Sequence, residues 1–392
     1  MLVLASKPRG LSPSQRFRLE QWAPHLARDH GIRLDFAPFE SRRLAAILYK
    51  PGRHVAKALL VAGDFFRRSK VLLDARNYDA VVIHREAALI GPAIYEQLLA
   101  WSGKPIIFDF DDSIWSPGQE MRHGIFSRLH FFGKTRTICR IASAVSAGNA
   151  FLADYARRVN DNVFVVPTTI ELANYPVVPE PSAERPFVVC WTGSTSTLAH
   201  FEYARVPLER LASEIPLVVN VICNVPPERP IAGAQMRFVG WSEEREAQEI
   251  GDCHVGIMPL PDNEVARGKC GLKALQCMAT GRPVVISPVG VNKEIIEHGK
   301  NGFLAGTADE FVSALLTLAR SRQLRQQMGA AARATIEARF SAEVGAAKFA
   351  QVVRNVTGDD GAPGPTRTDT PVKELDFESS ASTIPPQGHA PV

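Results

Sequence analysis

The sequence predicts an α/β fold made of two doubly wound, Rossmann-like domains that face a cleft. Three observations support this prediction. Short apolar runs alternate with helical stretches along the chain, the alternation starts again after an uneven, proline-rich segment at 171–186, and 392 residues suffice for two domains of ordinary size. Strands that alternate with helices favour a parallel sheet covered on both faces.

The first domain is predicted over residues 1–172. LVLASK at 2–7 is its first strand, and the loop PRGLSPSQ, an amphipathic helix (RFRLEQWAPHLARDHG) and a second strand (IRLDFAPF) follow. Four further apolar runs are expected strands, at 78–84, 104–110, 142–147 and 162–168. Because ligands of such sheets bind beyond the carboxyl ends of the strands, residues directly after these runs are candidates for a site.

A linker is predicted at 173–186 and a second domain at 187–340. Its expected strands are FVVCWTGS, PLVVNVICN, MRFVGW, HVGIMPL, RPVVISPV and NGFLA. A last helix is expected at 341–356. Residues 357–392 are predicted to be disordered, because half of these 36 residues are Pro, Gly, Ser or Thr and too little apolar surface remains to offset the entropy of ordering.

The composition indicates a globular protein, with 45% hydrophobic and 22% charged residues. The net charge of +4 divides into +8 over residues 1–356 and −4 over the tail, which holds two basic and six acidic residues. No run is long and apolar enough to cross a bilayer, and the first residues lack a signal-peptide pattern, so we expect a cytoplasmic protein. The six cysteines lack metal-site spacing and are expected to be reduced core thiols, with neither zinc nor disulfides.

The segment 254–305 carries most of the functional information. It has the pattern of strand, basic loop, short helix, strand, loop, helix and strand. Arg267, Lys269 and Lys273 crowd the start of the short helix, which Gly271 opens. Free backbone N–H groups, a positive dipole end and added cations predict a diphosphate site at this point.

Three polar residues of this short helix share one face. Lys269, Lys273 and Gln276 lie at i, i+4 and i+7, so two cations are placed to hold phosphates and an amide one turn later to bind ribose hydroxyls. A solvated helix face with ordinary lysines is the alternative.

The turn WTGSTST at 191–197 follows an expected strand and precedes a helix. Gly193 permits close approach of backbone to a ligand, and the hydroxyls of Ser194 and Thr195 can bind phosphate or base. The alternative is a structural turn in which Thr197 caps the helix.

The loop GLSPSQRFR at 10–18 follows the first strand of the first domain. Small residues such as Ser14 let the backbone approach a ligand, and Arg16 can meet an anionic group on the acceptor side. A structural turn with an exposed arginine is the alternative.

An acidic cluster ends the expected strand in IIFDFDDSIW. Asp109, Asp111 and Asp112 belong at the ligand edge of the sheet. Three interpretations stay open: carboxylates that act as a base or position an acceptor, the D-x-D signature of haloacid-dehalogenase phosphatases with a nucleophilic first Asp, and a structural cluster that caps the next helix.

His84 and Arg85 end the preceding expected strand and are therefore placed to lie beside the acidic cluster. A histidine near a carboxylate can serve as general base or bind an acceptor. We take Asp111 and His84 as candidate catalytic residues and Arg85 as an acceptor-side residue. A hydrogen-bonded histidine at a strand end is the alternative.

Residues 41–79 hold nine Arg or Lys residues that alternate with Leu, Val and Phe at helical spacing. Basic amphipathic helices of this kind can lie on anionic membranes at the inner face and collect a lipid-linked acceptor. A pair of helices on the domain surface is the alternative. Nucleic-acid binding is not predicted, because the sequence has no recognition motif and no interleaved aromatic residues.

Four motifs in the second half resemble a known family: MATGRPVV at 278–285, SPVGVNKEII at 287–296, HGKNGFLA at 298–305 and RQQMGAAARATIEARFS at 325–341. In order and spacing they resemble the carboxy-terminal domain of the group 1, family 4-like glycosyltransferases, which use nucleotide sugars and adopt the two-domain GT-B fold. The resemblance implies that the second domain binds the donor, that the first brings the acceptor, and that the helix at 341–356 crosses back to the first domain.

The resemblance further implies transfer of a sugar from a nucleotide diphosphate donor to a hydroxyl of a polysaccharide, lipid-linked or small glycan acceptor. No cofactor is expected, and no metal if Lys269 and Lys273 offset the diphosphate charge. A GT-B nucleotide-sugar epimerase and a catalytically silent sugar- or nucleotide-binding protein are the alternatives.

The sequence departs from the family at one position of the donor site. Many relatives carry two glutamates eight positions apart, one at the donor sugar and one at the ribose, where this chain has Gly268 and Gln276. The ribose role can pass to Gln276. The donor-sugar carboxylate is missing at Gly268 unless Asp262 or Glu264 of the preceding loop supplies it, and we include the neighbouring Asn263 among the donor-binding candidates.

Overall fold

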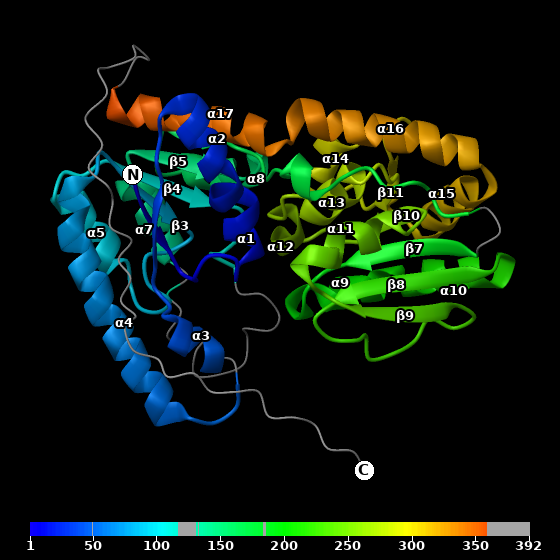
Figure 1. Cartoon of the computed structure of the whole chain (residues 1–392), viewed down its shortest axis with the longest axis horizontal. Helices are drawn as coiled ribbons and strands as arrows, with labels where there is room; N and C mark the ends of the chain where they lie inside the picture. The colour runs from blue at the N-terminus through cyan, green and yellow to red at the C-terminus, as the bar shows by residue number, and fades with distance from the viewer. Residues whose placement is uncertain (49, 117–130, 132, 183–185, 359–392) are drawn as a thin grey trace. The chain divides into compact units, whose positions relative to one another are not determined.

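The computed structural model describes residues 1–48, 50–116, 131, 133–182 and 186–358. Within them the chain forms two six-stranded sheets, each with neighbouring strands parallel, and helices on the sheet faces (Figure 1). The predicted α/β fold with two Rossmann-like halves is therefore confirmed. Residues 359–392 of the predicted disordered tail lie outside the described residues.

The first sheet has the strand order β2-β1-β3-β4-β5-β6. Its strands are β1 (Leu2–Ala5), β2 (Asp35–Pro38), β3 (Val81–His84), β4 (Ile106–Phe110), β5 (Ala144–Ala147) and β6 (Val163–Val165). The order reverses direction between β1 and β3, and such a switch point opens a ligand site at the carboxyl ends of the strands. The register pairs His84 with Asp109, and Asp109 with Ser146, at this edge.

A helical stretch that follows β1 contains a short π-helix. It consists of α1 (Pro13–Gln15), η1 (Arg16–Glu20) and α2 (Gln21–His30), and it starts three residues before the predicted helix, with proline in its first turn. The other described helices of this lobe are α3 (Arg42–Ile47), α4 (His54–Asp74), η2 (Ala75–Asn77), α5 (Ile94–Trp101), α7 (Lys134–Ile141) and α8 (Ala150–Arg157).

The second sheet has the order β12-β11-β10-β7-β8-β9, with its switch point between β7 and β10. Its strands are β7 (Phe187–Thr192), β8 (Leu217–Cys223), β9 (Gln235–Gly240), β10 (Val255–Met258), β11 (Val284–Ile286) and β12 (Phe303–Leu304). The helices that follow them include α9 (Leu198–Phe201), α10 (Arg205–Glu214), α11 (Glu243–Gly251), α12 (Glu264–Arg267), α13 (Leu272–Ala279), α14 (Asn292–Ile295), α15 (Ala308–Arg320) and α16 (Arg322–Arg339).

The last described helix, α17 (Ala342–Thr357), packs against α2 of the first lobe. The rings of Trp22 and Phe349 lie 5.5 Å apart between their centroids. Gly345 is required for this packing, because a Cβ there would lie 2.4 Å from the Trp22 indole nitrogen.

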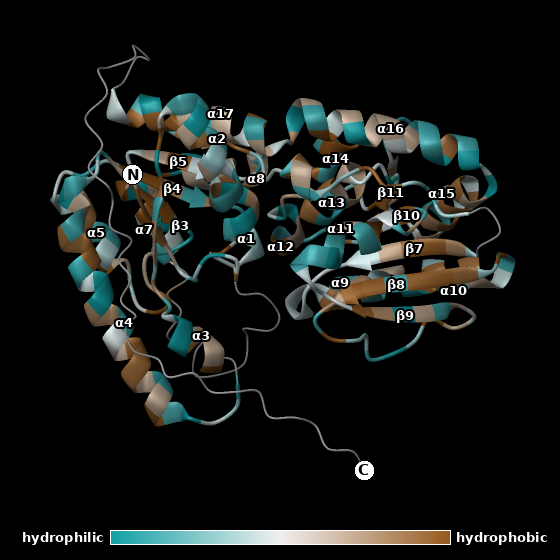
Figure 2. Ribbon diagram, in the orientation of Figure 1, coloured by the Kyte–Doolittle hydropathy of each residue, from teal (hydrophilic) through white to brown (hydrophobic). Residues whose placement is uncertain are grey.

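Hydrophobic residues concentrate on the strands of both sheets, as Figure 2 shows. All six cysteines are buried and none forms a disulfide. None of the described helices combines the length and the hydropathy that a membrane span requires.

Candidate functional site

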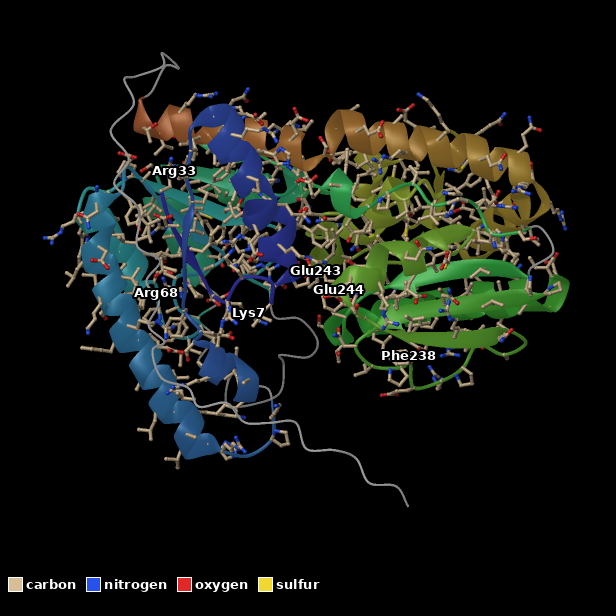
Figure 3. All side chains as sticks on the ribbon, viewed as in Figure 1. Lys7, Arg33, Arg68, Phe238, Glu243 and Glu244 are labelled. Atoms are coloured by element: carbon tan, nitrogen blue, oxygen red, sulfur yellow. The ribbon has the colours of Figure 1, made fainter. Side chains whose placement is uncertain are left out.

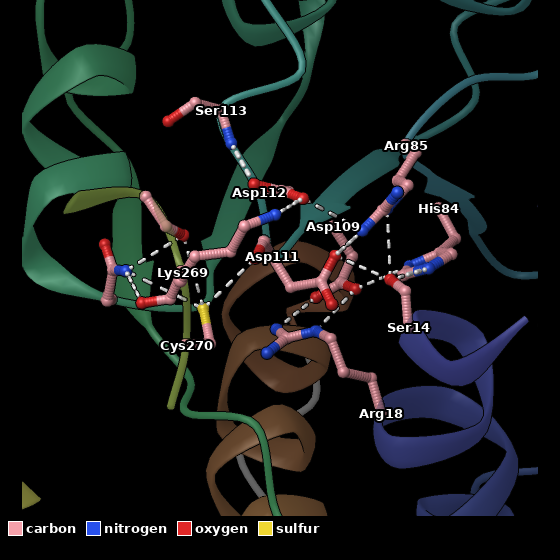
Figure 4. Close-up of polar contacts among 12 residues, drawn as sticks. Ser14, Arg18, His84, Arg85, Asp109, Asp111, Asp112, Ser113, Lys269 and Cys270 are labelled. Carbon is pink, nitrogen blue, oxygen red and sulfur yellow. Dashed lines mark hydrogen bonds and ion pairs between the residues drawn. The ribbon is translucent and has the colours of Figure 1, made fainter. Parts of the chain in front are cut away.

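A network of buried polar side chains lies at the carboxyl ends of β3 and β4 (Figure 4). The His84 Nδ1 atom lies 2.9 Å from Asp109 Oδ2, and its Nε2 atom lies 2.9 Å from the hydroxyl of Ser14 on α1. That hydroxyl also donates to Asp111 Oδ1 at 2.5 Å. The structure thus brings together the candidates Ser14, His84 and Asp111, which are up to 97 positions apart in sequence.

Asp109 is the fully buried, structural carboxylate of this network. Arg18 donates to both of its carboxylate oxygens, at 2.9 and 2.5 Å, and all three of Arg18, Asp109 and Ser146 are buried. Burial alone would raise the pKa of Asp109, but Arg18 and the hydrogen bonds outweigh burial and hold the pKa well below its usual value. A carboxylate enclosed in this way is not available as a nucleophile, which argues against the phosphatase interpretation.

Asp111 is the more accessible carboxylate, with 11% of its side chain exposed. Arg85 donates to its Oδ1 atom from Nε at 3.0 Å and from Nη2 at 2.8 Å. Although burial opposes ionisation, the charges of Arg85, His84 and Arg18 lower the pKa of Asp111 to about 2. Asp111 is therefore an ionised hydrogen-bond acceptor at neutral pH.

Arg85 has an unusual backbone conformation. Its φ of 62° lies in the left-handed region, which residues other than glycine rarely adopt. Its backbone N–H donates to the Asp109 carbonyl at 2.8 Å. Such backbone strain is concentrated at functional sites, which favours Arg85 as a site residue.

The loop that follows β4 contacts the loop before α13 of the second lobe. The Lys269 ammonium donates to Asp112 Oδ2 at 2.7 Å, and Cys270 packs within the core cluster of the first lobe. The Asn149 amide donates to three successive carbonyls of the second lobe, those of Arg267, Gly268 and Lys269, at 3.1 to 3.3 Å. Asp112 of the acidic cluster and Lys269, one of the predicted diphosphate-binding lysines, are therefore neighbours.

Gly268 packs directly against the first lobe. A Cβ at this position would lie 2.0 Å from the Ser113 hydroxyl oxygen and 3.0 Å from the Ser113 backbone nitrogen. In this arrangement the position cannot hold the glutamate that many relatives carry, because Ser113 fills the space.

The three candidates of the preceding loop each have a partner of their own. Asp262 is exposed and accepts from Arg267 at 2.7 Å, and Asn263 caps α12 by accepting from the Ala266 N–H at 2.9 Å. Glu264 accepts from the Trp115 indole of the first lobe at 2.8 Å. Among the described residues, Asp112 is thus the carboxylate that pairs with Lys269, a lysine predicted to bind diphosphate, and the sequence alone did not indicate this pairing.

Lys273 lies over the ring of Trp191, with its ammonium 4.2 Å from the ring centroid. Among the described residues, no carboxylate lies within ion-pair distance of Lys273. Burial, followed by the charge of Lys269, lowers the pKa of Lys273 to about 7. A desolvated cation without a counter-ion is the expected environment for binding an anion.

His200 on α9 is a neighbour of these lysines that the sequence analysis missed. Its pKa is lowered to about 4, first by burial and then by the charges of Lys273 and Lys269. The sequence contains a signal that could have found it. His200 lies on the first α-helix after β7, and β7 is a switch-point strand, at whose carboxyl end ligands bind.

The turn after β7 folds back onto Trp191. A Cβ on Gly193 would lie 2.3 Å from the Trp191 ring, so the close approach requires glycine. The Thr197 hydroxyl accepts from the Ser194 N–H at 3.0 Å, the reciprocal contact of a capping box in which Ser194, and not Thr197, is the N-cap. Contacts of Ser194 and Thr195 with a ligand stay predictions. The turn lies near Lys273, because Gly193 and the Lys273 ammonium both approach the ring of Trp191.

Gln276 has a partner in the segment between the two sheets. It is buried, and its amide donates to the Tyr175 hydroxyl at 2.9 Å. That hydroxyl donates to Glu246, which also pairs with Arg16 of the first lobe at 3.2 Å. A ribose contact therefore requires Gln276 to leave Tyr175, and Arg16 already has anionic partners in the second lobe.

A pocket adjoins this Arg16 network rather than the lysines. Its lining residues are Arg16, Gln21, Asn174, Tyr175, Glu243 and Glu244. Among the described residues, no group of three or more His, Cys, Asp or Glu side chains is placed to hold a metal ion.

Comparison with known proteins supports the predicted resemblance. Residues 226–321, within the second lobe, match the family model described as glycosyl transferases group 1. No curated protein matches the chain significantly. Three similar solved structures are HepE of Anabaena in complex with UDP and glucose, sucrose-phosphate synthase of Thermosynechococcus elongatus, and a glycosyltransferase of Rickettsia africae.

The similarity to these structures extends over nearly the whole of each chain. Sequence identities are 14%, 17% and 12%, and the TM-scores are 0.59, 0.63 and 0.63. They cover 90%, 91% and 91% of this chain and 98%, 99% and 99% of the solved chains. Identities this low show the fold alone. Together with the family match over residues 226–321, they confirm the predicted resemblance to the group 1 glycosyltransferases and the GT-B fold.

Proposed function

We propose that this protein transfers a sugar from a nucleotide diphosphate sugar to a hydroxyl acceptor without a metal ion. The bond between the anomeric carbon and the diphosphate oxygen breaks, and the acceptor oxygen forms the new bond to that carbon as its proton leaves to a base. The free nucleoside diphosphate carries the resulting negative charge. The residues that offset this charge are therefore the centre of the proposal.

The observation that carries the proposal is the state of Lys273. Its ammonium lies partly buried over Trp191, near the start of α13 and beside Lys269, with no carboxylate of the described residues in ion-pair range. Two lysines at a helix start can stabilise a departing diphosphate and thereby replace a metal ion in that role. The UDP bound in the Anabaena protein makes uridine donors the first to test.

The acceptor side is proposed to be built from Ser14, His84, Arg85 and Asp111. Asp111 is ionised and is joined to Arg85, so it can accept a hydrogen bond from the incoming hydroxyl and orient it. His84 is oriented by Asp109 through Nδ1, and its Nε2 atom lies 2.9 Å from the Ser14 hydroxyl. When Ser14 turns its single hydrogen from Asp111 to a neutral Nε2, a proton can pass from the acceptor through Ser14 to His84.

A donor panel tests this function. The protein is incubated with UDP-sugars, with and without candidate polysaccharide, lipid-linked and small glycan acceptors, and UDP release and donor identity are followed. UDP release that depends on acceptor, in buffer with EDTA, supports metal-independent transfer. An isomerised donor identifies an epimerase, and tight binding without either change identifies a binding protein.

Replacing Asp112 with asparagine is expected to tighten UDP binding by about three- to tenfold. In the ligand-free protein Asp112 lies 2.7 Å from Lys269 and competes with a diphosphate for that cation. Isothermal titration calorimetry of UDP measures the change. In a Lys269→Ala background the same substitution should have little effect, and an equal gain there would contradict competition for Lys269.

A further inference from the structure

The outer face of α4 carries large apolar side chains along most of its length. Val55, Leu59, Phe66 and Leu73 expose 75%, 69%, 66% and 71% of their surface. Their spacings of four, seven and seven residues return to nearly the same side of an α-helix, so they form one stripe about 27 Å long. A contiguous apolar stripe of this length marks an interaction surface.

The neighbouring helix α5 adds a second stripe. Ile94, Leu98 and Trp101, at i, i+4 and i+7, expose 55%, 45% and 79% of their surface. The two helices touch where the Tyr95 hydroxyl lies 3.1 Å from that of Ser69 and donates to the Phe65 carbonyl at 2.8 Å. Figures 1 and 2 show α4 and α5 on the same side of the first lobe, with hydrophobic segments along α4.

The fold does not depend on these exposed side chains, because α4 is held by its opposite face. There Asp64 accepts from the backbone N–H and hydroxyl of Ser41, at 2.9 and 3.1 Å. Arg68 is buried and donates to the carbonyls of Ala37 and Ala5, at 2.8 and 3.0 Å. Among the residues that the structure describes, the outer stripe thus has no packing role within the lobe.

Basic side chains border the stripe and identify its partner. Lys70 lies with its ammonium 4.8 Å from the Phe66 ring centroid, and Arg53 is exposed at the start of α4. Helix α4 has two acidic residues: Asp64 is buried and paired, and Asp74 is exposed at the carboxyl end of the helix. A lysine beside an exposed aromatic residue fits a bilayer surface, where apolar acyl chains lie beneath negatively charged headgroups. A twofold dimer through the same face would bring like charges together.

We propose that the outer faces of α4 and α5, here called the α4–α5 face, bind the surface of an anionic lipid bilayer. Phe66, Leu59 and Trp101 enter the boundary between headgroups and acyl chains, and Lys70 and Arg53 meet lipid phosphates. This inference does not depend on the proposed function, because binding to vesicles needs neither donor nor acceptor.

Flotation of the full chain with vesicles tests the α4–α5 face. The chain should float with phosphatidylcholine vesicles that contain phosphatidylglycerol, and much less with phosphatidylcholine alone. Phe66→Gln and Trp101→Gln should each weaken binding about tenfold, the size expected for losing a buried aromatic side chain. Lys70→Glu should weaken binding only to the anionic vesicles.

A matched control is Phe238→Gln, which changes a 43% exposed phenylalanine on β9 of the other lobe (Figure 3) and should leave flotation unchanged. Absence of flotation, or equal flotation of Phe66→Gln and the parent chain, would overturn the inference. So would a lipid-free dimer that Phe66→Gln disperses, because that result assigns the face to a second copy. The enzymatic activity on a water-soluble acceptor should be the same in these variants.

Discussion

Replacing Lys273 with alanine is expected to weaken binding of a nucleoside diphosphate by about ten- to a hundredfold. A hydrogen bond to a charged group contributes about 1.5–3 kcal/mol, and each 1.4 kcal/mol corresponds to a factor of ten. Nucleoside without phosphates should bind the variant and the parent equally, because the lysine is assigned to the phosphates. Calorimetric titrations with UDP and with uridine measure the two affinities.

Two further variants separate charge from packing and from general lysine effects. Lys273→Met keeps an unbranched chain over Trp191 without the charge, and it should lose as much affinity as the alanine variant. Lys300→Ala removes an exposed lysine that pairs with Glu297, and it should bind normally. Equal losses for UDP and uridine in Lys273→Ala would contradict the phosphate assignment.

The affinity for the donor should also fall as the pH rises above 7. The pKa of Lys273 is about 7 in the ligand-free protein, and a bound diphosphate must raise it by charge attraction. Between the two pKa values the complex holds one more proton than the free protein, so affinity declines by up to about tenfold per pH unit. A nucleotide sugar is the suitable ligand, since its diphosphate diester does not titrate there, and the decline should vanish in Lys273→Met.

Much of the fold could be predicted because the strands are buried on both faces. Runs such as IIFDF at 106–110 and FVVCWT at 187–192 are fully buried and contain almost no polar residues apart from Asp109 and Thr192. Continuous apolar runs of this kind identify strands without knowledge of their partners. The helix start at Gly271 could also be predicted, because a glycine before a helical pattern and nearby lysines are local sequence features. The structure confirms it, with Gly271 as the N-cap of α13 at φ of 72°.

The partners of the site residues could not be predicted, because they depend on how the two lobes pack. Gln276 has the spacing of a ligand-binding amide, yet it bonds to Tyr175, which comes from the segment between the sheets. The clash that excludes a side chain at Gly268 involves Ser113, more than a hundred positions away. The π-helix at 16–20 has no sequence signal that we recognise. From it Arg16 reaches the second lobe and Arg18 reaches Asp109.

Replacing Asp109 with asparagine is expected to destabilise the protein by about 3–5 kcal/mol, the largest effect on stability that we predict. The substitution keeps the shape of the side chain but leaves the fully buried guanidinium of Arg18 without its anionic partner. Removing one partner of a buried ion pair has this cost, because the remaining charge is uncompensated in a medium that solvates it poorly. The urea midpoint of unfolding, measured at neutral pH, reports the loss.

Asp111→Asn is the matched comparison, two positions further along the chain. Its partner Arg85 is 30% exposed and can turn to water, so we expect a loss of stability of about 1 kcal/mol but a loss of most transferase activity. Both aspartates have a lowered pKa, so their stabilisation is present above the usual carboxyl pKa of about 4 and is lost as the pH falls through the folded value, about 2 for Asp111. The parent chain should therefore lose stability between about pH 4 and 2 more steeply than Asp111→Asn. Equal stabilities of the two variants at neutral pH would show that Asp109 is not the structural member of the cluster.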